Sequence, residues 1–120
     1  MSKKTVVLGA SHKPHRYSNM AVNSLRQHDI EAVAVGRRAR QVGDWEILEG
    51  KPAVEDVDTV TLYLNSYNQK EFYDYILDLE PRRVIFNPGA ENVEFETLLE
   101  EKGVEVDRAC TLVMLRSSQY

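Results

Sequence analysis

Short apolar runs rich in β-branched residues recur along the chain. Runs of this kind predict strands that are buried on both faces, as in a parallel sheet. The predicted strands are residues 5–8 (TVVL), 30–35 (IEAVAV), 58–64 (DTVTLYL), 84–86 (VIF) and 104–106 (VEV).

Between these strands, apolar residues recur at three- and four-residue spacing, which is typical of helices with one buried face. The spacing predicts a helix that follows a cap at Ser18 or Asn19 and fades around residues 27–29, and two more over residues 70–79 and 93–102. Pro81 ends the second helix because proline has no backbone N–H to donate. Gly103 stands where the left-handed cap of the third helix belongs.

Regular alternation of strands and helices predicts an α/β fold. The expected architecture is one doubly wound parallel sheet of about five strands with helices on both faces. Residues 41–57 interrupt the alternation, and we expect Trp45, Ile47 and Leu48 to cover the edge of the sheet there. A length of 120 residues suits a single domain over the whole chain, residues 1–120.

A turn of small residues follows the first strand. Residues 9–11 (Gly-Ala-Ser) allow the backbone to turn sharply and to approach a ligand closely. A polar loop then leads to a helix that Ser18 or Asn19 can cap. This order directs a helix N-terminus at the space above the strand, where phosphate groups commonly bind. The G-x-G-x-x-G dinucleotide pattern is absent, and a tight turn without a ligand is the alternative.

Arginines follow the second predicted strand in the segment GRRAR, residues 36–40. In a doubly wound sheet, the carboxyl ends of neighbouring strands face one crevice, so this segment is expected near Gly9. NAD enzymes carry Asp or Glu here, whereas arginine favours a ribose with an extra phosphate, as in NADP or coenzyme A (CoA). The alternative is a solvated charged loop.

Composition narrows the classes of function. Hydrophobic residues make up 42% and charged residues 28% of the chain, as in ordinary globular proteins. A net charge of -4 argues against general nucleic-acid binding, which needs a basic surface. The single cysteine and the lack of a signal peptide predict a cytoplasmic protein. No apolar run approaches the roughly 20 residues that cross a bilayer.

Catalytic patterns are not recognised in the sequence. His12, His15 and His28 lack the spacing of metal ligands, and Cys110 has no partner sulfur. Ser11 follows a strand but lacks the G-x-S-x-G elbow of a nucleophile. We therefore predict no catalytic residues and no metal site.

Five segments together resemble the small bacterial CoA-binding proteins, whose Rossmann-like fold also forms the nucleotide-binding domain of the succinyl-CoA synthetase α subunit. They are VVLGAS, RYSNMAV, DVDTVTLYL, RRVIFNPGAEN and DRACTLVML. The resemblance spans essentially the whole chain, with a weak zone from about residue 37 to 55.

The resemblance implies a CoA site at the carboxyl edge of the sheet. In the family, the turn after the first strand and the loop that follows it hold the phosphates of CoA. The end of the second strand holds the adenosine, and the pantetheine arm is expected to pass along the turn after the fourth strand. This chain departs from the family's V-N-P at the end of strand two, where it has Val-Gly-Arg-Arg. The implied site residues are Gly9, Ala10, Ser11, Arg16, Tyr17, Ser18, Gly36, Arg37, Arg38, Leu64, Asn65, Asn87, Pro88 and Gly89.

Three hypotheses of function follow. The first is a module that binds CoA or an acyl-CoA without catalysis. The second is an NADP-binding redox protein, which the arginines favour and the missing glycine pattern opposes. The third is a scaffold that retains only the fold. The expected partner is a small-molecule nucleotide, with no nucleic acid and no membrane; a homodimer is compatible with the sequence, but nothing in it specifies one.

Overall fold

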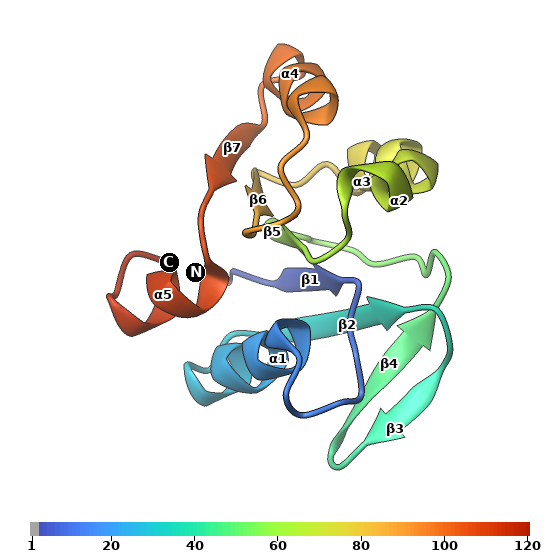
Figure 1. Ribbon diagram of the computed structural model, residues 1–120, viewed down its shortest axis with the longest axis vertical. Coiled ribbons are helices and arrows are strands. Elements are labelled where there is room, and N and C mark those ends of the chain that lie inside the picture. Colours follow the sequence, from blue (N-terminus) through green and yellow to red (C-terminus); the bar gives the residue numbers. More distant parts are fainter. Residues whose placement is uncertain (1–2) are drawn as a thin grey trace.

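The computed structural model describes residues 3–120, which form a seven-stranded sheet flanked by helices. The strand order is β3-β4-β2-β1-β5-β6-β7, and every neighbouring pair is parallel except β3 and β4 (Figure 1). The strands are β1 (Thr5–Leu8), β2 (Ala32–Gly36), β3 (Arg40–Val42), β4 (Trp45–Glu49), β5 (Thr59–Leu62), β6 (Arg83–Phe86) and β7 (Glu105–Arg108).

Helices cover both faces of the sheet. One face carries α1 and α5, and the other carries α4 and the broken helix made of α2, η1 and α3 (Figure 1). The bounds are α1 (Tyr17–Gln27), α2 (Ser66–Gln69), the 3₁₀ turn η1 (Lys70–Phe72), α3 (Tyr73–Leu79), α4 (Val93–Glu101) and α5 (Thr111–Arg116). This arrangement confirms the predicted doubly wound, Rossmann-like α/β architecture, with parallel pairing throughout most of the sheet.

Side chains of β1 alternate between the two cores that its neighbouring helices complete. Val6 and Leu8 pack in the cluster that contains Phe95 of α4, whereas Val7 packs with Val22 and other residues of the opposite face. Both sides of the strand are therefore buried, which explains its unbroken apolar sequence.

The structure has two more strands than predicted, and both lie within residues 40–49. Gly43 and Asp44 form the tight turn of a β3–β4 hairpin, and β4 joins β2 in parallel. Ile47 is buried opposite Ala34, so β4 extends the sheet and does not merely cover its edge.

Two helical boundaries also differ from the prediction. The N-cap of α1 is Arg16, because Ser18 and Asn19 are already buried within the first turn of the helix. The second helix begins at Ser66 and is capped by Asn65, whose side chain accepts a hydrogen bond from the Asn68 amide.

Residues 111–115 (TLVML) are apolar but were assigned to no element, and they form most of helix α5, since a short apolar run does not distinguish a helix from a strand. At the end of α4, the prediction for Gly103 is confirmed, since it has φ +80° just after the helix.

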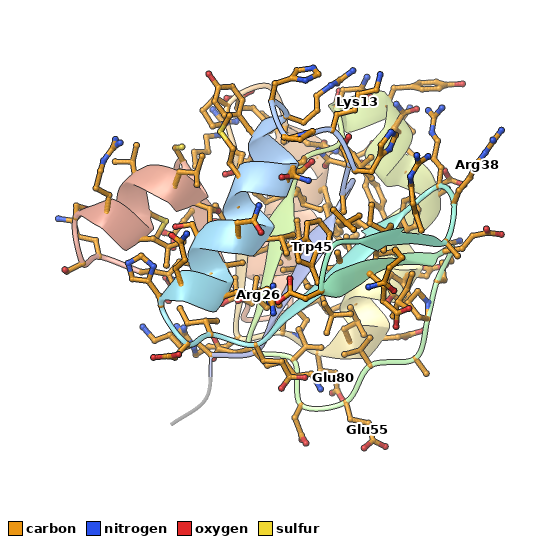
Figure 2. The ribbon with its side chains drawn as sticks, turned by 90° about the horizontal axis from the view of Figure 1, so that it is seen from below. Lys13, Arg26, Arg38, Trp45, Glu55 and Glu80 are labelled. Atoms are coloured by element: carbon orange, nitrogen blue, oxygen red, sulfur yellow. The ribbon has the colours of Figure 1, made fainter. Side chains whose placement is uncertain are left out.

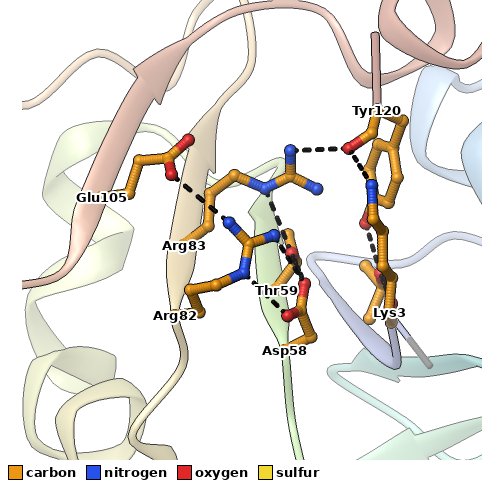
Figure 3. Close-up of polar contacts among 8 residues, drawn as sticks. Lys3, Asp58, Thr59, Arg82, Arg83, Glu105 and Tyr120 are labelled. Atoms are coloured by element: carbon orange, nitrogen blue, oxygen red, sulfur yellow. Dashed lines mark hydrogen bonds and ion pairs between the residues drawn. The ribbon is translucent and has the colours of Figure 1, made fainter. Parts of the chain in front are cut away.

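Cations at the amino edge of the sheet are paired within the protein (Figure 3). Arg82 forms ion pairs with Asp58 at 2.9 Å and Glu105 at 3.3 Å. The buried Arg83 donates to the backbone carbonyl of Tyr120 at 3.0 Å and stacks over the Tyr120 ring. Both arginines therefore bridge segments of the fold at the edge opposite to the carboxyl ends of the strands.

Candidate functional site

A hollow of about 920 Å³ opens at the carboxyl ends of the central strands. The chain leaves β1 toward β2 on one side and later crosses back over β1 to β5, and ligands of open α/β sheets bind at such a switch point. The lining residues are Leu8, Gly9, Ala10, Ser11, His12, Lys13, Val35, Gly36, Arg37, Arg38, Arg40, Ile47, Gly50, Lys51, Leu64, Asn68, Glu71 and Phe72.

The turn after β1 forms one wall of the hollow. The amide N–H groups of Gly9 and Ala10 both donate to the Val35 carbonyl at 2.9 Å, which folds the turn against β2. Gly9 has φ +94°, and a Cβ there would lie 3.1 Å from the Tyr63 carbonyl carbon. Glycine is therefore required both by the backbone conformation and by the close approach of the chain after β5.

Gly36 is the last residue of β2 and lies where the chain packs most closely beside the hollow. A Cβ at this position would lie 2.8 Å from the Ala10 carbonyl oxygen and 2.9 Å from Cγ2 of Ile47. Because glycine has no side chain, the turn after β1 can lie directly against the end of β2. The two glycines thus bring the first turn and the arginine segment together.

Five cations surround the hollow: Lys13, Arg37, Arg38, Arg40 and Lys51. Their side chains are exposed, and within residues 3–120 none lies within 4.0 Å of a carboxylate oxygen. Across the described chain, the hollow has one acidic lining residue, on η1. Lys13 and Arg38 project from the same end of the molecule, opposite to Glu55 and Glu80 (Figure 2). The rim is therefore positive although the protein carries a net charge of -4, and it attracts anions.

His12 lies among these cations and is half-buried. Partial desolvation, followed by the charges of Arg40 and Lys13, lowers the pKa of His12 below its ordinary value. The imidazole is thus predominantly neutral at pH 7 when the hollow holds no anion.

Seven of the predicted site residues line the hollow: Gly9, Ala10, Ser11, Gly36, Arg37, Arg38 and Leu64. The two segments that the sequence analysis expected in one crevice are therefore brought together. Arg16, Tyr17 and Ser18 lie at the start of α1 outside the lining, with Ser18 buried and Tyr17 exposed.

Asn65, Asn87, Pro88 and Gly89 also lie outside the lining. Asn87 is buried and uses its side chain inside the fold: it donates to Thr61 Oγ1 at 2.7 Å and to the Leu62 carbonyl at 2.9 Å. It also accepts from the amide of the first residue of α5. The role of Asn87, Pro88 and Gly89 in holding a pantetheine arm stays a prediction, as does a ligand role for Asn65.

Sequence reasoning did not include several lining residues in the site. Arg40 and Lys51 reach it because the β3–β4 hairpin folds back beside β2. The Gly-Asp pair between two short runs with β-propensity is a recognised hairpin signal and could have revealed them. Asn68 and Phe72 come from the broken helix, whose early start at Ser66 was not predicted.

Other reactive side chains lie away from the hollow. Cys110 is half-buried at the N-cap of α5 and does not line it. Burial raises the pKa of Tyr63 to about 12, and its hydroxyl finds no hydrogen-bond partner among residues 3–120. In the same residues no group of three or more His, Cys, Asp or Glu side chains is placed to hold a metal ion. None of the helices described is long and apolar enough to span a membrane.

Comparison with known proteins identifies the family. The model of the CoA-binding domain family matches residues 3–116. A solved structure described as an uncharacterized protein is 47% identical, with a TM-score of 0.95 over 100% of this chain and 99% of that one. Two more distant structures share the fold, and no match is found among curated proteins.

One of these two comes from Thermus thermophilus (22% identity, TM-score 0.83, covering 98% of this chain and 91% of that one). The other is a protein redesigned for binding (19% identity, TM-score 0.84, covering 99% of this chain and 86% of that one). Because the family model spans nearly the whole chain, this protein belongs to the CoA-binding domain family.

Proposed function

We propose that this protein binds CoA or an acyl-CoA in the hollow at the carboxyl edge of its sheet and does not catalyse a reaction on it. The observation that carries the proposal is the ring of five exposed cations without carboxylate partners within residues 3–120. CoA carries a pyrophosphate and a 3′-phosphate, so several cations are needed to balance its charge. Membership of the CoA-binding domain family supports the same ligand.

The lining also suits the uncharged parts of a nucleotide. Ala10, Leu64 and Phe72 line the hollow and are half-buried, so they present apolar surface to it. Ligand sites commonly combine an apolar lining with a few well-placed polar groups, in volumes of roughly 300–1,000 Å³. A base can pack on this surface while Arg37 and Arg38 hold the 3′-phosphate through charge-assisted hydrogen bonds.

The non-catalytic part of the proposal rests on the sequence, in which no catalytic pattern is recognised. Among the described lining residues there is no cysteine and no pair of carboxylates. Ser11 Oγ accepts a hydrogen bond from the Lys13 amide at 3.1 Å, and the chain turns there without a nucleophile elbow.

Calorimetric titration with CoA, 3′-dephospho-CoA and NADP tests the proposal. We expect CoA to bind most tightly, and binding to weaken when the 3′-phosphate is removed. Arg37→Ala or Arg38→Ala should each weaken CoA binding by about 1–3 kcal/mol, the range for a charge-assisted contact. Arg116→Ala, on α5 and outside the hollow, is the matched control.

Each other outcome has a definite meaning. Binding of NADP alone would replace the proposal with a redox function, which the same arginines favour. Equal binding of CoA and dephospho-CoA would support a CoA-binding module but would refute the role of Arg37 and Arg38 in holding the 3′-phosphate. No binding of any of the three would favour a scaffold.

A further inference from the structure

We infer that Gln69 is a positioning residue of the hollow: its buried side chain holds one wall of the hollow in place, and the affinity for the ligand depends on it. The wall is the segment from Leu64 to Phe72, of which Leu64, Asn68, Glu71 and Phe72 line the hollow. Gln69 itself does not line it. The inference deepens the proposed function and rests on it for the ligand, whereas the position of the wall can be followed without one.

The side-chain amide of Gln69 joins this wall to the turn after β6. Its Nε2 donates to the Leu64 carbonyl at 2.8 Å and to the Ala90 carbonyl at 2.7 Å. Its Oε1 accepts a hydrogen bond from Asn92 Nδ2 at 2.9 Å. The side chain is fully buried, so bulk water does not compete for these bonds. Gln69 therefore fixes the distance between the segments that follow β5 and β6.

The far end of this bridge is itself held in place. Asn92 is the N-cap of α4, and its Oδ1 accepts a hydrogen bond from the Phe95 amide at 3.1 Å. Its Nδ2 also donates to the Tyr73 hydroxyl at 2.8 Å. The rings of Tyr73 and Phe95 are stacked, with their centroids 4.2 Å apart. The amide of Gln69 thus connects the wall to α4 and to the first residue of α3.

Little else holds the wall at this point. The helix breaks directly after Gln69, where α2 gives way to the 3₁₀ turn η1, and such a break within a helix often marks a hinge. Of the residues in α2 and η1, Gln69 is the one that is fully buried. Phe72, at the end of η1, lies with its ring centroid 5.4 Å from Lys51 Nζ. A shift of the wall would therefore also move a cation of the rim.

Movement of the wall lowers affinity through the fraction of molecules that are ready to bind. The apparent dissociation constant equals the intrinsic one divided by that fraction, so a wall in place about a tenth of the time weakens binding about tenfold. Without the Gln69 amide, the Leu64 and Ala90 carbonyls lose a shared donor and no longer hold the two segments together. The cations that meet the ligand are unchanged, and only their preorganised partner wall is lost.

Calorimetric titration of the full chain with CoA tests this role, at a temperature at which circular dichroism shows every variant folded. Gln69→Leu should weaken binding about tenfold at every pH. Arg83→Met is the matched control, because it loses buried hydrogen bonds to Thr59 and Tyr120 at the opposite edge of the sheet. We expect it to bind CoA as the wild type does. Asn92→Ser keeps an oxygen for the cap but loses the bond to Gln69, and it should give a smaller loss.

Gln69→Glu separates the donor role from a general loss of packing. It keeps the shape of the side chain, but an ionised carboxylate cannot donate to the two carbonyls. Burial raises the pKa of a carboxyl group, so this side chain becomes a donor again as the pH falls. The affinity of Gln69→Glu relative to the wild type should therefore be low at pH 8 and recover toward pH 5.5. The ratio removes the titration of CoA itself.

Three results would overturn the role of Gln69: wild-type affinity in Gln69→Leu, an equal loss in Arg83→Met, or a Gln69→Glu variant as weak at pH 5.5 as at pH 8. Hydrogen exchange of the amides of residues 65–72 follows the wall without a ligand. If CoA does not bind the wild type, but Gln69→Leu loses protection there and Arg83→Met does not, the positioning role stands and the proposed function fails. Unchanged protection in Gln69→Leu refutes the positioning role whether or not CoA binds.

Discussion

Three glycines differ in the two properties that make an alanine costly, so together they test the close packing around the hollow. Gly43 has φ +59° and nothing within 4 Å of an added Cβ. Gly36 lacks a positive φ, but its Cβ would lie 2.8 Å from the Ala10 carbonyl oxygen. Gly9 combines φ +94° with a Cβ 3.1 Å from Leu64 Cδ2 and from the Tyr63 backbone. Alanine thus introduces backbone strain at Gly43, crowding at Gly36, and both at Gly9.

The expected losses in the free energy of unfolding follow from these two terms. A non-glycine residue at positive φ costs roughly 1–3 kcal/mol, of which about 0.4–1 kcal/mol is returned by the less flexible unfolded chain. Crowding in a packed site costs roughly 1–3 kcal/mol. We therefore expect losses of about 1 kcal/mol for Gly43→Ala, about 2 for Gly36→Ala and about 3 for Gly9→Ala.

Urea unfolding of the three variants and the wild type, followed by circular dichroism, measures these differences. The slope of the transition should stay constant, because the surface exposed on unfolding does not change. Thermal midpoints should fall by about 3–6 °C per kcal/mol in a domain of this size. If Gly9→Ala were no less stable than Gly43→Ala, the turn could move away from the chain after β5, and the argument for close packing would be refuted.

Further predictions concern groups outside the hollow. Asn87→Ala should lower the free energy of unfolding by about 3 kcal/mol in urea titrations, because three buried hydrogen bonds are lost at about 1 kcal/mol each; a loss below 1 kcal/mol would contradict this. The Arg82 guanidinium lowers the pKa of Asp58, so this carboxylate contributes stability that is fully present above the unfolded-state pKa, near 4, and is lost as the pH falls through the lower folded-state value. Urea unfolding between pH 6 and 2.5 should therefore be less pH-dependent in Asp58→Asn, and an unchanged pH profile would argue against the pairing. Tyr63→Phe should raise the free energy of unfolding by about 1 kcal/mol in the same assay, because the buried hydroxyl makes no hydrogen bond of normal geometry within residues 3–120, although Thr61 and Thr111 lie beside it; a destabilised variant would show that one of these threonines is its partner.

The centre of the fold could be predicted from the sequence because burial on both faces leaves a strong pattern. The strands at residues 5–8 and 84–86 are apolar except for Thr5 and appear at those positions, with one residue added before the second. The hairpin was missed because β3 is exposed and polar, so its residues carry no apolar pattern. Only the Gly-Asp turn signals it, and two residues are weak evidence in a segment with other turn formers.

The candidate site was predictable to the extent that topology determines it. Gly9 and Arg37 lie about one strand and one helix apart in sequence, and parallel pairing of their strands brings them to one edge. Arg40 was expected near Gly9 as part of residues 36–40, although it was not named as a site residue. Lys51 depends on the hairpin, so it could not be assigned before the hairpin was known. Asn87 shows the opposite limit: a polar residue at a strand end looks the same in sequence whether it faces a ligand or completes a buried network.

The positive rim on an acidic protein has a kinetic consequence. The molecule measures 38 × 31 × 27 Å, and the Debye length is about 30 Å at 0.01 M salt and about 10 Å at 0.1 M. At the lower concentration an approaching polyanion senses the whole negative protein, whereas at the higher one it senses mainly the rim. The association rate of CoA should therefore first rise with added salt and fall only when the rim itself is screened.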